Sequence, residues 1–86
     1  MTIMSEIKYP KLIRLSEVLN RCPISRSTLY KQIKAGLFPR PVQISDNCVA
    51  WIESEIDKIL LVKIARFDPE QIKKLVRELE DGRDRI

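Results

Sequence analysis

The segment from Ile24 to Gly36 carries every local signal needed for one short, self-contained helix. Ser25 is a preferred N-cap residue, because its hydroxyl oxygen can accept a hydrogen bond from a free backbone N–H of the first turn. Ile24 before the cap and Leu29 in the helix fit a hydrophobic staple. Gly36 fits the left-handed residue that ends many helices. We therefore expect a helix over residues 26–35.

The two sides of this helix differ sharply in character. Leu29 and Ile33 lie four residues apart and form an apolar stripe, which we expect to be buried. Five side chains that point away from this stripe are basic or carry hydroxyl groups: Arg26, Ser27, Tyr30, Lys31 and Lys34. These are residue types that contact phosphates and base edges in a DNA groove. The alternative for Ser27 and Thr28 is an ordinary solvent-exposed helix surface.

A second short helix is expected just before this one, over residues 17–22. Ser16 is a candidate N-cap, and Pro23 ends the helix because proline disfavours a helical conformation in the residue before it. Apolar side chains share one face of this helix: Leu15, Val18, Leu19 and Cys22. Two short helices joined by about three residues have helix-turn-helix geometry.

A small hairpin is expected over residues 42–51. Val42-Gln43-Ile44 alternates apolar and polar residues, as a half-buried strand does, and Cys48-Val49-Ala50-Trp51 forms the returning strand after a polar turn. The size and place of this hairpin match a wing beside a helix-turn-helix. We interpret Trp51 as structural, since an aromatic residue between a strand and a helix usually packs in the core.

Two further helices are expected after the hairpin, over about residues 53–66 and 69–81. Asp68 can cap the last helix, Pro69 suits its first position, and Gln71 can complete a capping box. We expect Gly82 to end it and residues 83–86 to form a polar tail. Its apolar stripe must pack back on the domain or against a second copy: Ile72, Leu75, Val76 and Leu79.

The expected fold is therefore mainly α with a small β-hairpin. It consists of a flexible N-terminal arm over residues 1–11, a winged helix-turn-helix over residues 12–66, and a C-terminal helix within residues 67–86. A chain of 86 residues is the size of one small domain. Such a domain contacts few base pairs, so we expect homodimers or cooperative assembly on DNA.

The basic charge is concentrated in the first half of the chain. Residues 1–44 contain eight Lys or Arg and two acidic residues, whereas residues 45–86 contain eight Lys or Arg and ten acidic residues. The first half is thus the better match for a polyanion such as DNA.

Several classes of protein are disfavoured by composition. The chain has no histidine and only two cysteines, without a paired-cysteine motif, so we expect no metal ion and no cofactor. No apolar run is long enough to cross a membrane, and we expect a cytoplasmic location with no membrane partner. We do not expect an enzyme, because no nucleophile has a recognisable base. The acidic residues 53, 55 and 57 suit the first turn of a helix for ordinary dipole reasons.

Four short motifs occur in a fixed order between about residues 12 and 60. They are Leu15-Ser16-Glu17-Val18, Ser25-Arg26-Ser27-Thr28-Leu29-Tyr30, Phe38-Pro39-Arg40-Pro41-Val42 and Val49-Ala50-Trp51-Ile52-Glu53-Ser54-Glu55-Ile56. Together they resemble the AlpA family of short prophage regulators, relatives of phage excisionases and of the MerR-type winged helix. The resemblance implies binding to double-stranded DNA and control of transcription at a neighbouring integrase gene or prophage operon.

In this interpretation the helix over residues 26–35 enters the major groove and the wing over residues 42–51 lies on the backbone. Arg26 is our first candidate for reading a base edge, since its guanidinium can pair with a guanine through two hydrogen bonds. The candidate DNA-binding residues are Ser25, Arg26, Ser27, Thr28, Tyr30, Lys31, Lys34, Arg40, Gln43 and Asn47.

The wing departs from the family pattern at its tip. Family members commonly carry an arginine about where Asn47 stands, and the neighbouring Asp46 is unfavourable near phosphate. Arg40 and Gln43 are the candidates to compensate for the missing charge.

Two other functions stay open at this level. One is an excisionase-like architectural factor that bends attachment-site DNA and recruits integrase. The other is a protein-interaction module, such as an anti-repressor whose basic face meets an acidic partner. In the protein-interaction alternative, Arg26→Ala should not alter DNA affinity, and the last helix should carry the activity.

Overall fold

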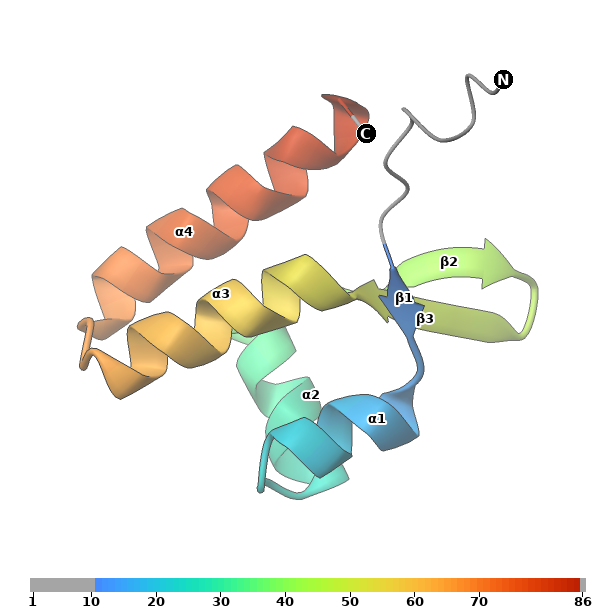
Figure 1. Ribbon diagram of the computed structural model, residues 1–86, viewed down its shortest axis with the longest axis horizontal. Helices are drawn as coiled ribbons and strands as arrows, with labels where there is room; N and C mark the ends of the chain where they lie inside the picture. Colours follow the sequence, from blue (N-terminus) through green and yellow to red (C-terminus); the bar gives the residue numbers. More distant parts are fainter. Residues whose placement is uncertain (1–10, 86) are drawn as a thin grey trace, which may run out of the picture.

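The structure, a computed structural model, describes residues 11–85 and is mostly helical with a small antiparallel sheet (Figure 1). The predicted fold class, a winged-helix-like arrangement with a C-terminal helix, is confirmed. Of the predicted N-terminal arm, residues 1–11, all but Lys11 lie outside the described residues. The elements in chain order are β1 (Leu12–Ile13), α1 (Leu15–Arg21), α2 (Arg26–Lys34), β2 (Val42–Ser45), β3 (Cys48–Ile52), α3 (Glu53–Ile64), α4 (Pro69–Asp81) and a 3-10 turn (Gly82–Arg85).

The sheet has the strand order β1-β3-β2. The β2–β3 hairpin confirms the prediction over residues 42–51, with Ser45 opposite Cys48, so that the turn consists of residues 46–47 alone. On the other side of β3, β1 adds a third strand in which Ile13 lies opposite Trp51. This pairing ties the start of α1 to the base of the hairpin.

Helix α2 begins at Arg26 as predicted and ends at Lys34, one residue before the predicted end. The Ser25 hydroxyl oxygen accepts a hydrogen bond from the backbone N–H of Thr28 at 3.1 Å. Gly36 has a φ of 79°, in the left-handed region that glycine adopts without a steric penalty. Leu29 is fully buried, which fixes the orientation of the helix on the core.

The predicted N-cap of α1, Ser16, is wrong. The helix starts at Leu15, and Arg14 occupies the cap position without a side-chain hydrogen bond. The carbonyl of Arg14 accepts the N–H groups of Glu17 and Val18 at 3.0 Å each. Because β1 ends at Ile13, which is paired and buried, the chain turns directly into the helix and Ser16 falls inside the first turn.

Trp51 lies at the centre of the core, as predicted, with none of its surface exposed. Its indole N–H donates to the carbonyl oxygen of Pro39 at 3.1 Å, so the one polar group of the ring is satisfied inside the protein. Phe38, 1% exposed, belongs to the same cluster. The segment between α2 and β2 is therefore held against β3 although it has no regular structure.

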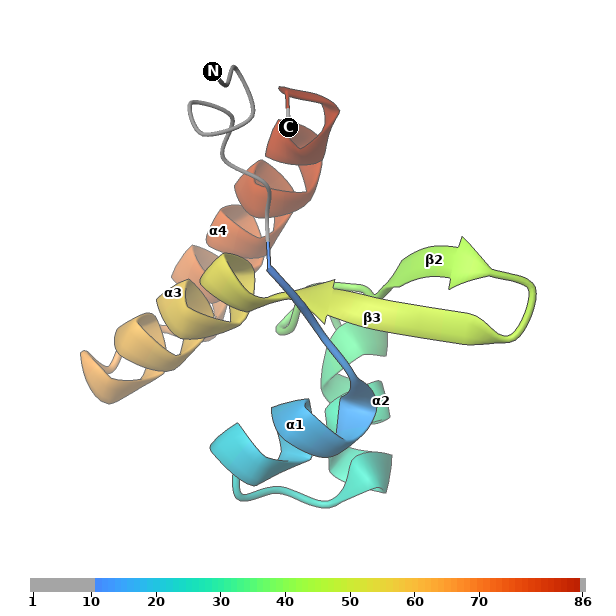
Figure 2. The ribbon, with the colours of Figure 1, turned by 45° about the vertical axis from the view of Figure 1, so that its right-hand side comes forward.

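Helices α3 and α4 lie side by side (Figures 1 and 2). The predicted capping box of α4 is confirmed: the Asp68 carboxylate accepts the Gln71 N–H at 2.9 Å, and the Gln71 side chain accepts the Asp68 N–H at 3.0 Å. Ile72 and Val76 of α4 are buried in the same core as α1, α2 and α3. Ile64, by contrast, is 78% exposed, because α3 ends there.

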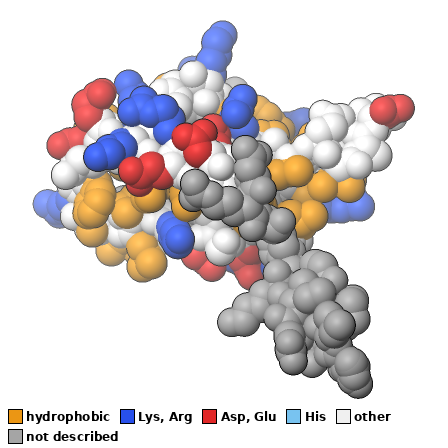
Figure 3. Space-filling view, turned by 90° about the horizontal axis from the view of Figure 1, so that it is seen from above, with side chains coloured by type: hydrophobic (Ala, Val, Ile, Leu, Met, Phe, Trp, Pro, Cys, Tyr) orange, Lys and Arg blue, Asp and Glu red, His pale blue; other side chains and the backbone are white. Residues whose placement is uncertain are grey.

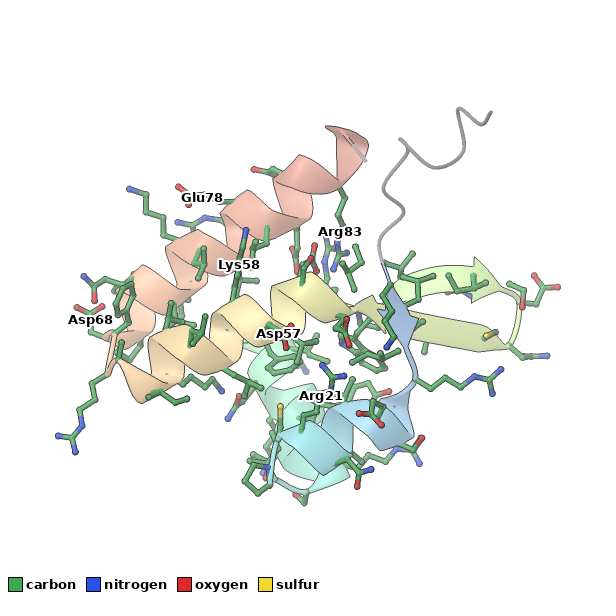
Figure 4. All side chains as sticks on the ribbon, viewed as in Figure 1. Arg21, Asp57, Lys58, Asp68, Glu78 and Arg83 are labelled. Carbon is green, nitrogen blue, oxygen red and sulfur yellow. The ribbon has the colours of Figure 1, made fainter. Side chains whose placement is uncertain are left out.

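The predicted polar tail after Gly82 is wrong. Residues Gly82–Arg85 form a 3-10 turn, and Arg83 reaches back to α3 (Figure 4). Its Nη2 lies 2.6 Å and its Nε 3.0 Å from the two carboxylate oxygens of Glu55, which is 4% exposed. A buried carboxylate requires such a partner, and these hydrogen bonds raise the pKa of Arg83.

Candidate nucleic-acid interface

The outward face of α2 carries a shallow, open hollow. The residues that line it are Arg26, Ser27, Tyr30, Lys31 and Lys34, and we call this site the α2 hollow. Their spacing of three and four residues places them on one face of the helix, away from the buried Leu29. Five of the ten residues predicted from the sequence are thus gathered on one surface.

The cations of the α2 hollow have no internal ionic partner among the side chains that the structure describes. No described carboxylate oxygen lies within 4.0 Å of the charged nitrogens of Arg26, Lys31 or Lys34. Tyr30, 39% exposed, stands between them. This surface therefore offers positive charge, hydroxyl groups and one aromatic ring to a ligand from outside.

Ser25 and Thr28 build the start of α2. Besides accepting the Thr28 N–H, the Ser25 hydroxyl donates to the Thr28 hydroxyl oxygen at 2.9 Å. Both side chains thus hold the first turn in place. The free N–H groups and the positive end of the helix dipole at this terminus favour a phosphate.

Arg40 is not part of the α2 hollow. Its backbone N–H donates to Oε2 of Glu80 at 2.9 Å, and its Nε lies 3.3 Å from Oε1 of the same residue. The segment after α2 is thereby connected to α4. The Arg40 side chain is 69% exposed in spite of this pair.

The β2–β3 hairpin projects from the helices (Figure 2) and carries two predicted residues, Gln43 within β2, opposite Val49, and Asn47 in the turn. The amide of Gln43 donates to the backbone carbonyls of Ser45 and Asp46 at 2.7 and 3.2 Å. The side-chain N–H groups of Gln43 therefore stabilise the turn of the hairpin through these two hydrogen bonds. Asn47 lies in the turn itself and is exposed.

Sequence reasoning missed Arg14, which lies beside the hairpin. Arg14 and Ser16, at the start of α1, line a hollow together with Asn47. Arg14 is exposed, so a positive charge stands close to the place where the sequence lacks one. Only the pairing of β1 with β3 brings these residues together, and no local motif signals it.

The acidic residues at the start of α3 have partners on other elements. Arg21, at the end of α1, donates to Glu53 at 2.7 Å, Glu17 at 3.0 Å and Asp57 at 3.3 Å (Figure 4). The hydrogen bond from Arg21 lowers the pKa of Glu53. Together with the pair of Arg83 and Glu55, these contacts give the acidic cluster a structural role.

Two further features of residues 11–85 bear on function. No helix within this range has the length and apolar character that crossing a bilayer requires. Nor does this range contain a group of three or more Cys, Asp or Glu side chains placed to hold a metal ion.

Comparison with known proteins agrees with this geometry. Residues 11–60, which run from β1 into α3, match the family model described as prophage CP4-57 regulatory protein (AlpA). The chain is also similar to the uncharacterized protein ORF88 of Enterobacteria phage P4, with 36% identity over 62 residues. That match covers 72% of this chain and 70% of the phage protein. The chain therefore belongs to the AlpA family of prophage regulatory proteins.

Proposed function

We propose that this chain is a sequence-specific DNA-binding regulator of transcription in a prophage or integrated element. The observation that carries the proposal is the α2 hollow, where three cations without a described carboxylate partner lie on one exposed helix face. A B-DNA major groove is about 12 Å wide and admits an α-helix. In this proposal α2 lies in that groove.

The side chains of α2 divide into base-reading and phosphate-binding groups. Arg26, at the N-terminal end, is placed to donate two hydrogen bonds to a guanine, and Tyr30 and Lys31 follow one turn later. The hydroxyl of Ser27 is suited to a phosphate next to the helix N-terminus. Lys34, at the other end of the helix, is suited to a phosphate across the groove.

The β2–β3 hairpin is proposed to contact the backbone as a wing. Asn47 can donate a hydrogen bond to a phosphate oxygen from the turn, and the exposed Arg14 beside it supplies positive charge. Arg14 thus takes over part of the role that an arginine at the tip has in the family pattern.

We further propose that two copies bind adjacent half-sites. Helix α4 buries Ile72 and Val76 within its own domain, so its apolar stripe is already largely used. Leu61 and Phe67, near the end of α3, are 64% and 44% exposed and supply apolar surface for a second copy. A regular half-site spacing in bound DNA, together with sedimentation of the complex, tests this step.

The experiment that tests the proposal begins with selection from random-sequence duplex DNA. Affinity for the selected duplex is then measured against salt for the wild type, Arg26→Ala, Lys34→Ala and, as a charge-matched control, Lys58→Ala on the exposed face of α3. Arg26→Ala should cost about 1–3 kcal/mol and relax the preference at one base pair. Lys34→Ala should weaken binding to all sequences alike and reduce the salt slope by about 0.9.

No enriched motif, or equal affinity in Arg26→Ala and the wild type, would overturn the proposal and favour a protein-interaction module. A bending assay on promoter and attachment-site duplexes distinguishes the regulator from an architectural factor. The regulator is expected to prefer promoter DNA, whereas an excision factor is expected to bind and bend attachment-site DNA, with integrase as its partner.

A further inference from the structure

We propose that α4 carries a second phosphate-binding site, which extends the DNA contact of α2 onto the flanking backbone. The site is the groove between the C-terminal end of α2 and α4, here called the α2–α4 groove, and its key residues are Lys34, Lys73 and Arg77. The inference rests on the proposed function. It adds two residues that lie beyond residues 11–60, the part of the chain that matches the family model.

The α2–α4 groove is continuous with the α2 hollow, because Lys34 lines both. Its charged lining consists of Lys34, Arg40, Lys73 and Arg77 against the single carboxylate of Glu80. Figure 3 views the molecule from above, over α4, where Lys and Arg side chains alternate with Asp and Glu side chains; the excess of positive charge belongs to the lining of the groove itself. The positive surface of α2 thus continues onto α4.

Internal ion pairs do not cancel this charge. Glu80 is engaged with Arg40, which leaves the other three cations in excess. Lys73 lies 3.5 Å from Glu70, but that carboxylate is 85% exposed, and such a pair is weak in water. Among the described side chains, Arg77 and Lys34 have no carboxylate within 4.0 Å.

Packing between the turn after α2 and helix α4 holds the two sides of the groove together. The left-handed turn at Gly36 passes close to α4, where a Cβ added to the glycine would lie 3.8 Å from Cγ of Lys73. Val76, 3% exposed, anchors α4 in the core between Lys73 and Arg77. The aliphatic part of Lys73 therefore covers the turn, while its charged end is available at the surface.

The width of the DNA major groove leads us to expect the sugar-phosphate backbone of DNA at the α2–α4 groove. Helix α2 has nine residues and is therefore about 13 Å long, close to the width of about 12 Å of the major groove. If the N-terminal end of α2 reads bases, its C-terminal end lies near the wall of the groove, where the phosphates are. Because Lys34 of α2 lines the same groove as Lys73 and Arg77 of α4, the cations of α4 lie beside this end of α2.

The test compares two double variants of the full chain that each remove two positive charges. Lys73→Ala with Arg77→Ala removes the cations of the groove. Lys58→Ala with Lys74→Ala removes two exposed cations elsewhere, of which Lys74 lines a different hollow beside Phe67. Affinity for the selected duplex is measured from 50 to 200 mM salt, and urea unfolding shows that each variant is folded.

The groove variant should lower the slope of log affinity against log salt by about 1.8, because each lost phosphate contact removes about 0.9. Its loss of affinity should therefore be about tenfold larger at 50 mM than at 200 mM salt. Its preference among selected sequences should not change, because phosphate contacts carry no sequence information directly. The control variant should retain the wild-type slope.

Equal slopes in the two double variants would overturn the inference, as would a changed sequence preference in the groove variant. These failures are distinct from failure of the proposed function. If Arg26→Ala weakens binding while the groove variant matches its control, only the site on α4 is excluded. If the wild type selects no DNA, the proposed function fails and this inference fails with it.

Discussion

Arg21 and Arg26 are five residues apart in the sequence, yet their surroundings are opposite. Arg21 ends α1 and has three carboxylates within 3.3 Å, on α1 and α3. Arg26 begins α2 and has no carboxylate within 4.0 Å among the described side chains. The guanidinium of Arg21 connects α1 to α3, whereas the guanidinium of Arg26 is exposed to solvent.

This difference separates the cations of the chain into two groups. Arg21 and Arg83 each bind carboxylates of α3 and stabilise the fold. Arg26, Lys31 and Lys34 lie together on α2 without a described carboxylate partner, and they are the cations proposed to contact phosphates and base edges. The net charge of +4 does not reveal this division, because only the three-dimensional structure shows which charges are already paired.

The largest expected effect comes from breaking the most buried of these pairs. Arg83→Ala leaves the carboxylate of Glu55, 4% exposed, without its partner, which should cost about 3 kcal/mol of unfolding free energy. Urea unfolding followed by circular dichroism measures this loss. Replacing both residues by methionine should restore most of it, since the buried charge is then gone. A loss below about 1 kcal/mol in Arg83→Ala contradicts a structural role for this pair.

Ser25 offers a way to separate folding from binding at one position. Ser25→Ala removes the N-cap hydrogen bond and should cost about 1 kcal/mol of stability. Ser25→Asp keeps a capping side chain but places a negative charge where a phosphate is expected. It should therefore unfold at nearly the wild-type urea concentration and bind the selected duplex more weakly. Wild-type affinity in Ser25→Asp would show that no phosphate lies at this helix end.

A smaller, stabilising effect is expected where α3 ends. Arg66 has a φ of 62°, and the N–H of Phe67 bonds to the carbonyl of Val62, the same arrangement that Gly36 provides after α2. Arg66→Gly removes the steric penalty of a left-handed residue, and the greater freedom of glycine in the unfolded chain offsets part of the gain. We expect a net stabilisation of about 0.5 kcal/mol. DNA affinity should be unchanged, and a destabilised variant would contradict this explanation of the turn.

The smallest effect is expected in the pH dependence of stability. Arg21 lowers the pKa of Glu53 in the folded protein below its value in the unfolded chain. The ionised Glu53 therefore stabilises the folded state at pH values above the unfolded-state pKa, and this contribution is lost as the pH falls through the folded-state pKa. Between about pH 5 and pH 3 the wild type should therefore lose more stability than Arg21→Ala. The pair is partly exposed, so the difference should shrink at high salt. If the unfolding free energies of the wild type and Arg21→Ala fall equally with decreasing pH, the pairing of Arg21 with Glu53 is contradicted.

Local signals made much of this fold predictable. The cap at Ser25, the left-handed Gly36 and the capping box at Asp68 each act within four residues of the helix end that they define. The hairpin was also predictable, because its two strands are joined by a short polar turn. The face of α2 followed directly from helical periodicity once Leu29 was assigned to the core.

Contacts between distant residues were not predictable in the same way. Strand β1 has two residues, too few to show alternation, and its partner β3 lies about forty residues later, so the neighbourhood of Arg14 and Asn47 stayed hidden. The partners of Arg83 lie 28 and 43 residues away, and the end of the chain therefore resembled a polar tail. For the same reason the sequence suggested Arg40 only as a DNA-binding candidate and gave no sign of its pair with Glu80 on α4.

The most direct test of the division between paired and exposed cations is one experiment on Arg21→Ala and Arg26→Ala. Affinity for the selected duplex and the urea midpoint of unfolding are measured for both variants under identical conditions. Arg26→Ala should lose about 1–3 kcal/mol of binding free energy with an unchanged midpoint, and Arg21→Ala should keep its affinity with a lower midpoint. Equal losses of affinity in the two variants, both folded, would contradict the account.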